Sequence, residues 1–159
     1  MKSKTLMLTE ASLIAALYVV LTLLSNIAGL ASGVIQLRLS EMLTVLPMFT
    51  RSAVPGLTIG CIIANMLTGC ALWDVVFGSL ATLLGAVGTM CIGKKKPLLA
   101  LLCPIVSNTL IVPKLLQSVY GAEGSYLFFT VTVGLGELLS CGVLGLILYK
   151  LLKRTDIFG

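Results

Sequence analysis

The stretch LTEASLIAALYVVLTLLSNIAGL, residues 8–30, decides the fold of this chain. A bilayer core about 30 Å thick is crossed by about 20 helical residues, and this run is long enough to cross it. The run is unbroken, which favours a helix over the alternating segments of a membrane barrel. Basic residues before an apolar run also begin a signal peptide, but Glu10 interrupts its start and the run is longer than a signal peptide needs. We therefore predict a first membrane-spanning helix.

The composition of the whole chain indicates an integral membrane protein. Of its 159 residues, 58% are hydrophobic and 11% are charged, whereas a soluble domain carries about 25% charged residues. Neither end has a polar excess long enough to bury a core of its own. We therefore predict a single transmembrane domain over residues 1–159.

Further apolar runs, separated by turn signals, follow the first one. They cover residues 40–49, 55–68, 73–92, 98–116 and 126–152. We therefore predict an all-α integral membrane fold with six transmembrane helices. The runs at 40–49 and 55–68 are short and only residues 50–54 separate them. Five spans with one re-entrant segment is therefore the alternative.

The basic residues are concentrated at one set of span ends, and such residues stay on the cytoplasmic side. With both termini cytoplasmic, that side holds Lys2, Lys4, Arg51, Lys94, Lys95, Lys96, Lys150, Lys153 and Arg154. Only Arg38 and Lys114 then lie outside. The net charge of +5 is thus explained by topology. Because these residues are divided among separate ends, they do not indicate a nucleic-acid partner.

Polar and amphipathic residues interrupt the apolar runs. A charged side chain at a helix centre costs about 2.5–3.5 kcal/mol on insertion, so such residues usually face a cavity or one another. In the predicted topology they lie in the outer half of the membrane or near its midplane. They are Gln36, Arg38, Glu41, Asn65, Trp73, Asp74, Asn108, Lys114 and Glu137, of which all but Gln36 are candidate site residues. This distribution predicts a polar pocket open to the outside, which suits capture of a small polar molecule and not a continuous pore.

Structural roles for these residues remain open. Arg38 and Glu41 can pair at the start of a helix, and Asp74 is well placed in a first helical turn. The tryptophan can anchor the interface, and the two asparagines can link helices. Glu137 and Lys114 can form a buried pair. Glu137 is the hardest to explain by structure alone.

The sequence contains no motif for catalysis, for ATP binding or for a metal. It has no GxxxxGK[ST] loop, no HExxH and no GxSxG. The five cysteines lack a CxxC spacing and the chain has no histidine. We expect no enzyme activity, no catalytic residues, no cofactor and no metal site. Accumulation against a gradient would need ion coupling or an energising partner.

Small residues recur at helical spacing and allow close helix contacts. Gly56, Gly60 and Ala64 form one row, which we interpret as internal packing. Ala11 and Ala15 form a second row near the cytoplasmic end of the first helix. We predict that this pair docks on a partner membrane protein.

Four strings of the chain are similar to a known family. They are RLSEMLTVLPMFTRSAVPGLTIGCIIANMLTG, LWDVVFGSLATLLG, NTLIV and VGLGELLSC. From about Leu17 to Leu148 the chain resembles the queuosine-precursor transporter family, QueT, whose members are S components of energy-coupling factor (ECF) transporters. The resemblance implies six helices, cytoplasmic termini, a ligand site near the outer face and the plasma membrane of a bacterium. It also implies that Ala11 and Ala15, as an AxxxA motif, dock on the transmembrane T component, and that two ATPase subunits supply the energy.

The substrates that the resemblance implies are deazaguanines, such as the aminomethyl and cyano forms, queuine or queuosine. Such a molecule has a flat face, an edge of N–H donors and a carbonyl, and one form carries an aminomethyl cation. We expect Glu41 or Glu137 to accept from the donor edge, and the other to face the cation. An asparagine would then meet the carbonyl, Trp73 would stack on the ring, and Arg38 would hold Glu41.

Two other functions remain open from the sequence. The chain could be an S component for a different vitamin. It could also be a self-sufficient proton-coupled carrier in which Glu137 titrates, as intramembrane carboxylates often do. Ligand competition would distinguish an S component for another vitamin from a deazaguanine transporter. Uptake by the chain alone would identify a proton-coupled carrier.

Overall fold

The computed structural model describes residues 3–31, 35–121 and 123–155, so the predicted cytoplasmic Lys2 lies outside the described residues. Helix α1 (Lys4–Ile27) is the first predicted span. It begins after Ser3, whose hydroxyl accepts the backbone N–H of Leu6 at 3.2 Å, as an N-cap residue does. It ends before Gly29, whose φ of 70° lies in the left-handed region that glycine adopts without strain. Its length and apolar composition suit a membrane crossing.

The second predicted span has a different structure from the first. Residues 40–49 fall in η1 (Leu39–Met48), a ten-residue 3₁₀ helix with Pro47 inside it. At about 2.0 Å per residue, η1 is about 20 Å long, which is too short to cross a bilayer core. Its backbone is tied to α1, because the N–H of Leu39 donates to Ser25 Oγ at 2.9 Å. Most of η1 is buried, as irregular backbone at membrane depth must be unless it lines a cavity.

The rest of the described chain is helical. The elements are α2 (Ala53–Leu67), α3 (Leu72–Gly93), α4 (Pro97–Ala100), α5 (Leu102–Ser118), α6 (Tyr126–Glu137), the π-helix η2 (Leu138–Leu144) and α7 (Gly145–Thr155). Within the described residues, four helices are long and apolar enough to cross a membrane: Lys4–Ile27, Leu72–Gly93, Pro97–Ser118 and Tyr126–Thr155. The prediction of an all-α fold is confirmed for the described residues, and the four long apolar helices are consistent with an integral membrane protein. The predicted spans at 40–49 and 55–68 are helices of 10 and 15 residues, shorter than a full crossing requires.

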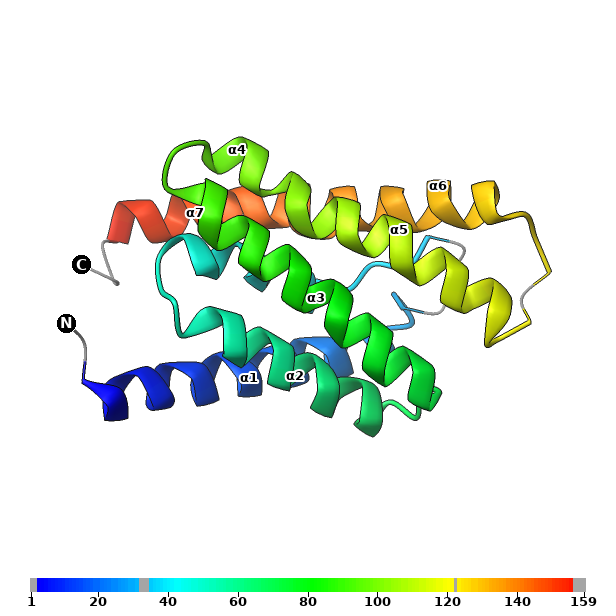
Figure 1. Ribbon diagram of the computed structural model, residues 1–159, viewed down its shortest axis with the longest axis horizontal. Helices are drawn as coiled ribbons and strands as arrows, with labels where there is room; N and C mark the ends of the chain where they lie inside the picture. The colour runs from blue at the N-terminus through cyan, green and yellow to red at the C-terminus, as the bar shows by residue number, and fades with distance from the viewer. Residues whose placement is uncertain (1–2, 32–34, 122, 156–159) are drawn as a thin grey trace.

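The elements form an elongated bundle around η1. Successive segments run in alternating directions along the long axis, and both ends of the chain lie at the same end of the bundle (Figure 1). Helix α1 packs on α2, α2 on α3, α3 on α5 and α5 on α6. The 3₁₀ helix η1 contacts α1, α2, α3, α7 and η2. Its side chains are therefore surrounded by the other helices.

The glycine row on α2 packs against α1, as the sequence indicates. A Cβ at Gly56 would lie 2.7 Å from the carbonyl oxygen of Ala11, and one at Gly60 would lie 3.0 Å from the Cα of Ala15. Ala11 and Ala15 are accordingly only 9% and 8% exposed. Both residues therefore lie on the face of α1 that packs against α2. Docking of this pair on a partner stays a prediction.

Candidate functional site

A polar chamber of about 310 Å³ lies at the end of the bundle opposite the chain ends (Figure 1). The end of α1, the end of α2, the start of α3 and the segment before η1 surround it. Its lining residues are Thr22, Ser25, Asn26, Ala31, Gln36, Arg38, Asn65, Thr68, Cys70, Asp74, Leu116 and Tyr120. Most of these side chains carry hydrogen-bonding groups. We call this cavity the outer chamber.

Hydrogen bonds between elements hold the carboxylate of Asp74 in the outer chamber. Tyr120 donates its hydroxyl to Asp74 Oδ2 at 3.1 Å and accepts the backbone N–H of Ala71 at 3.1 Å. Burial, with a contribution from the Asp74 carboxylate, raises the pKa of Tyr120 to about 12, so the phenol remains a donor at neutral pH. Asn65 Nδ2 donates to the carbonyl oxygen of Asp74 at 3.4 Å. The chamber wall is thus built from α2, α3 and the segment after α5.

A smaller cavity of about 20 Å³ adjoins the outer chamber. Gln36 and Arg38 line both cavities, so the smaller one is adjacent to the larger. Its lining residues are Gln36, Arg38, Glu41, Gly78, Thr82, Asn108, Val112, Val133 and Glu137. A space of 10–15 Å³ holds one water-sized group, so this cavity admits one small substituent and not a ring. We call it the inner cleft.

Glu41 reaches the inner cleft from the first turn of η1 and is 1% exposed. Tyr18 of α1 donates its hydroxyl to Glu41 Oε1 at 2.5 Å, and Asn108 of α5 donates Nδ2 to Oε2 at 3.4 Å. The sequence suggests Arg38 as the partner that holds Glu41. The structure gives this role to a tyrosine and an asparagine from two other helices. Arg38 lies at the boundary between the two cavities.

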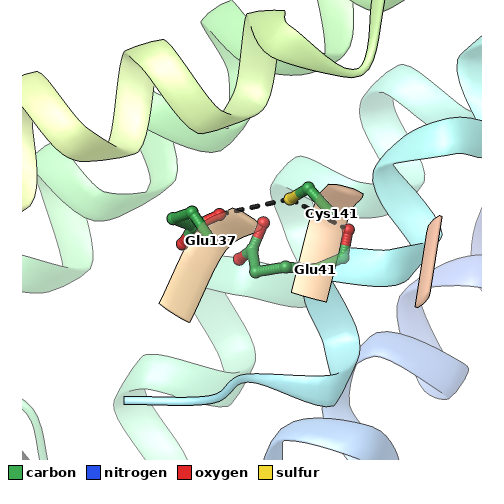
Figure 2. Close-up of side chains that lie close together, drawn as sticks. All are labelled: Glu41, Glu137 and Cys141. Carbon is green, nitrogen blue, oxygen red and sulfur yellow. Dashed lines mark hydrogen bonds between the residues drawn. The ribbon is translucent and has the colours of Figure 1, made fainter. Parts of the chain in front are cut away.

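Glu137 and Glu41 both line the cleft, and Cys141 lies close to both of them (Figure 2). Cys141 Sγ donates to Glu137 Oε2 at 3.1 Å and to the carbonyl oxygen of Glu41 at 3.5 Å. A ligand atom of each of these three side chains lies within 4.8 Å of the others, and all three residues are buried. Glu137 ends α6 where the π-helix η2 begins, a feature frequent at functional sites. Two facing carboxylates beside a thiol would stabilise a cation, either an organic ammonium group or a metal ion.

The structure brings together six of the eight predicted site residues. Glu41, Glu137 and Asn108 line the inner cleft, Asn65 and Asp74 line the outer chamber, and Arg38 lines both. Trp73 and Lys114 instead line a groove between α3 and α5.

Helix geometry explains why these two residues are elsewhere. Trp73 precedes Asp74, and neighbouring residues on a helix point about 100° apart. With Asp74 turned inward and 5% exposed, Trp73 is 60% exposed and stacks on Phe77, with 6.0 Å between ring centroids. Lys114 follows Asn108 by six positions, which places it on a different face of α5. It therefore does not pair with Glu137.

Sequence reasoning missed Tyr18, Tyr120 and Cys141, and it placed Gln36 in the outer polar layer without naming it as a site residue. A signal for Tyr18 was present, because the buried face of α1 consists, apart from Ile14, of small and polar residues: Ala11, Ala15, Tyr18, Thr22 and Ser25. This spacing of four and three residues marks one helix face, and the aromatic hydroxyl lies on it. Cys141 lies four residues after Glu137, so the two also share a face. Gln36 and Tyr120 lie outside the regular helices and gave no periodic signal.

Comparison with known proteins agrees with the resemblance seen in the sequence. A family model described as QueT transporter matches residues 8–154. A protein of Lactococcus lactis subsp. cremoris (strain MG1363), named queuosine precursor transporter QueT, is 32% identical to this chain over 171 residues, covering 98% of each protein. No solved structure matches the chain.

Proposed function

Since the chain belongs to the QueT transporter family, we propose that it captures a queuosine precursor, a deazaguanine, in the outer chamber and inner cleft. The observation that carries this proposal is the pair of buried carboxylates, Glu41 and Glu137, beneath a polar chamber. The chamber volume of about 310 Å³ falls at the lower end of the range for small-molecule pockets, which begins at about 300 Å³.

The two cavities divide the substrate between them. The flat ring is too large for the inner cleft and occupies the outer chamber. There, the Asp74 carboxylate accepts from the N–H edge of the ring, and Asn65 donates to its carbonyl. The aminomethyl group of the cationic precursor enters the inner cleft between Glu41 and Glu137. This assignment gives Asp74 the role that the sequence suggested for one of the glutamates.

The transport role is that of an S component of an ECF importer in the plasma membrane of a bacterium. The alternating segments and shared end of the termini support six membrane passages with both termini cytoplasmic (Figure 1). The 3₁₀ helix and residues 35–38 together would make the second passage. Beyond Glu41, the buried side chains of η1 are apolar except Thr44, among them Leu43, Val45 and Leu46, which argues against a continuous polar pore. The chain therefore captures its ligand, and a T component with two ATPase subunits drives its uptake.

Calorimetric titration of the purified chain in detergent tests the capture function. The titrants are the aminomethyl and cyano deazaguanines, queuine, guanine and a panel of vitamins. We expect tight binding of a deazaguanine, much weaker binding of guanine, and a preference for the cationic aminomethyl form over the neutral cyano form. Binding of an unrelated vitamin alone would overturn the proposed substrate.

Substitution of the carboxylates tests the site itself. Glu137→Gln is nearly isosteric and removes the charge, and we expect at least a tenfold loss of affinity for the aminomethyl form, about 1.4 kcal/mol. Affinity for the cyano form should change less. Glu123→Gln is the matched control, because Glu123 is exposed and lines neither cavity. An unchanged affinity in Glu137→Gln would remove this residue from the site.

Uptake into proteoliposomes tests the coupling. The chain alone, with a proton gradient and without ATPase subunits, should not accumulate a deazaguanine. Accumulation under these conditions would identify a self-sufficient proton-coupled carrier and would overturn the assignment as an S component.

A further inference from the structure

A separate cavity of about 330 Å³ lies at the opposite end of the bundle, where the chain ends are found (Figure 1). One wall is the end of η1 and the turn into α2, and the other is the last part of α3. Its lining residues are Pro47, Met48, Phe49, Thr50, Arg51, Met90, Cys91 and Lys94. No residue of this set lines the outer chamber or the inner cleft. The cavity therefore needs its own explanation.

The cavity combines a cationic rim with apolar walls. Arg51 and Lys94 line it from opposite walls, and both are exposed. Lys95 and Lys96, also exposed, follow Lys94 in the turn after α3. The hydroxyl of Thr50 is engaged, because it donates to Glu10 Oε2 at 2.8 Å. The cationic side chains of the rim are thus the groups available to meet a ligand, and the ligand they favour is an anion.

The position of the rim relative to the bilayer follows from α3. This helix is long and apolar enough to cross a membrane, and Lys94 directly follows its last residue, Gly93. The cationic groups therefore lie at the level of lipid headgroups, and the apolar wall at Phe49 and Met90 lies toward the acyl chains. Basic pockets between membrane helices bind anionic lipid headgroups in this way.

We propose that this cavity binds one anionic phospholipid, with its phosphate between Arg51 and Lys94 and an acyl chain along Phe49 and Met90. The site depends on charge and on an apolar wall together. A soluble anion would use only the charged groups, and a neutral lipid would use only the apolar wall. A bound lipid would link the turn between η1 and α2 to the end of α3.

The test measures lipids that remain bound to the full-length chain. The chain is reconstituted into vesicles of phosphatidylcholine with or without phosphatidylglycerol, extracted in mild detergent and examined by native mass spectrometry. We expect the wild-type chain to retain one phosphatidylglycerol molecule and no phosphatidylcholine. Each basic residue near an anionic surface contributes about 1 kcal/mol to lipid binding. The double substitution Arg51→Gln and Lys94→Gln removes two such contributions. Because 1.4 kcal/mol corresponds to a tenfold change in affinity, it should weaken retention about thirtyfold.

Two further variants distinguish a specific lipid-binding site from a nonspecific effect of positive charge. Lys150→Gln with Lys153→Gln removes the same charge from exposed residues of α7 that do not line the cavity, and should retain the lipid as the wild type does. Cys91→Trp keeps both cations and fills the apolar part of the cavity, and should lose the lipid. An equal loss in the α7 control, full retention in Cys91→Trp, or displacement of the lipid by inorganic phosphate would each overturn the proposal.

Discussion

The backbone carbonyl oxygen of Gln36 lies directly against Gly136 of α6, where a Cβ would collide with it. This contact sets the position of the segment before η1, because Gln36 lines both the outer chamber and the inner cleft. A glycine at position 136 is therefore required by the lack of space and not by backbone conformation, since its φ is not among the positive values. The glycine allows an irregular segment to lie on a helix.

Substitution Gly136→Ala tests this contact. The added methyl group must push the Gln36 carbonyl away, and the displaced segment carries Arg38 with it. We expect deazaguanine affinity to fall at least tenfold in calorimetric titration. Gly134→Ala is the matched control on the same helix, because its Cβ would meet the side chain of Thr109 at an ordinary 3.5 Å. Equal affinities in the two variants would show that the segment does not shape the site.

The hydroxyl of Tyr18 supports the carboxylate of Glu41, and its removal gives a second prediction. Tyr18→Phe keeps the ring and deletes the donor to Glu41 Oε1, leaving a buried acceptor with one partner fewer. Such a loss costs about 1–3 kcal/mol. We expect a lower thermal midpoint in detergent and weaker binding of the aminomethyl precursor. Tyr126→Phe is the control, since the Tyr126 hydroxyl bonds the Leu110 carbonyl oxygen at the surface. If only stability changes, Tyr18 is structural and does not position Glu41 for the ligand.

Much of the architecture follows from the sequence because it depends on the length and composition of apolar runs. The runs at 8–30, 73–92, 98–116 and 126–152 correspond to helices long enough to cross a bilayer. The run at 40–49 does not reveal its 3₁₀ conformation, since local propensity does not distinguish it from a short α-helix. Pro47 was the local sign of an irregular helix. The contacts of η1 with α7 and η2 join residues far apart in sequence, and no periodicity encodes them.

The candidate site follows from the sequence only in part. An intramembrane charge must find a cavity or a partner, which is why Glu41, Glu137 and Asp74 were found without a structure. Their partners depend on helix rotation, and an error of one residue turns a side chain by about 100°. This explains the positions of Trp73 and Lys114, which line a groove outside the two polar cavities. The supporting residue Tyr18 lies on the buried stripe of α1, but that stripe alone does not show that its hydroxyl bonds Glu41, 23 residues away in the sequence.

The groove occupied by Trp73 and Lys114 gives a third prediction. Both residues lie outside the two polar cavities, so Trp73→Leu and Lys114→Gln should each leave deazaguanine affinity unchanged within about twofold, less than 0.5 kcal/mol. Asn108→Leu, from the same helix as Lys114, should weaken binding strongly because it removes a donor to Glu41. Calorimetric titration of the three variants compares them directly. A large loss in Trp73→Leu would mean that the ring stacks on this tryptophan and that the ligand occupies the groove.

The close contact of α1 with α2 links packing to the site and gives the last prediction. A Cβ at Gly60 would lie 2.8 Å from the Cβ of Tyr18 and 3.0 Å from the backbone of Ala15. Gly60→Ala therefore has to move α1 away from α2, at a cost of about 1–3 kcal/mol for overpacking. Because Tyr18 moves with α1, its bond to Glu41 lengthens as well.

We expect Gly60→Ala to lower both the thermal midpoint and the affinity for the aminomethyl precursor. Gly142→Ala serves as its control, because a Cβ there would meet only side-chain atoms, the nearest at 3.6 Å. The double variant Gly60→Ala with Tyr18→Phe separates the two effects. If Gly60→Ala acts on binding through Tyr18, it adds little to the affinity loss of Tyr18→Phe, while its loss of stability remains. Fully additive affinity losses would contradict this coupling and would place the effect of Gly60 elsewhere in the contact between the two helices.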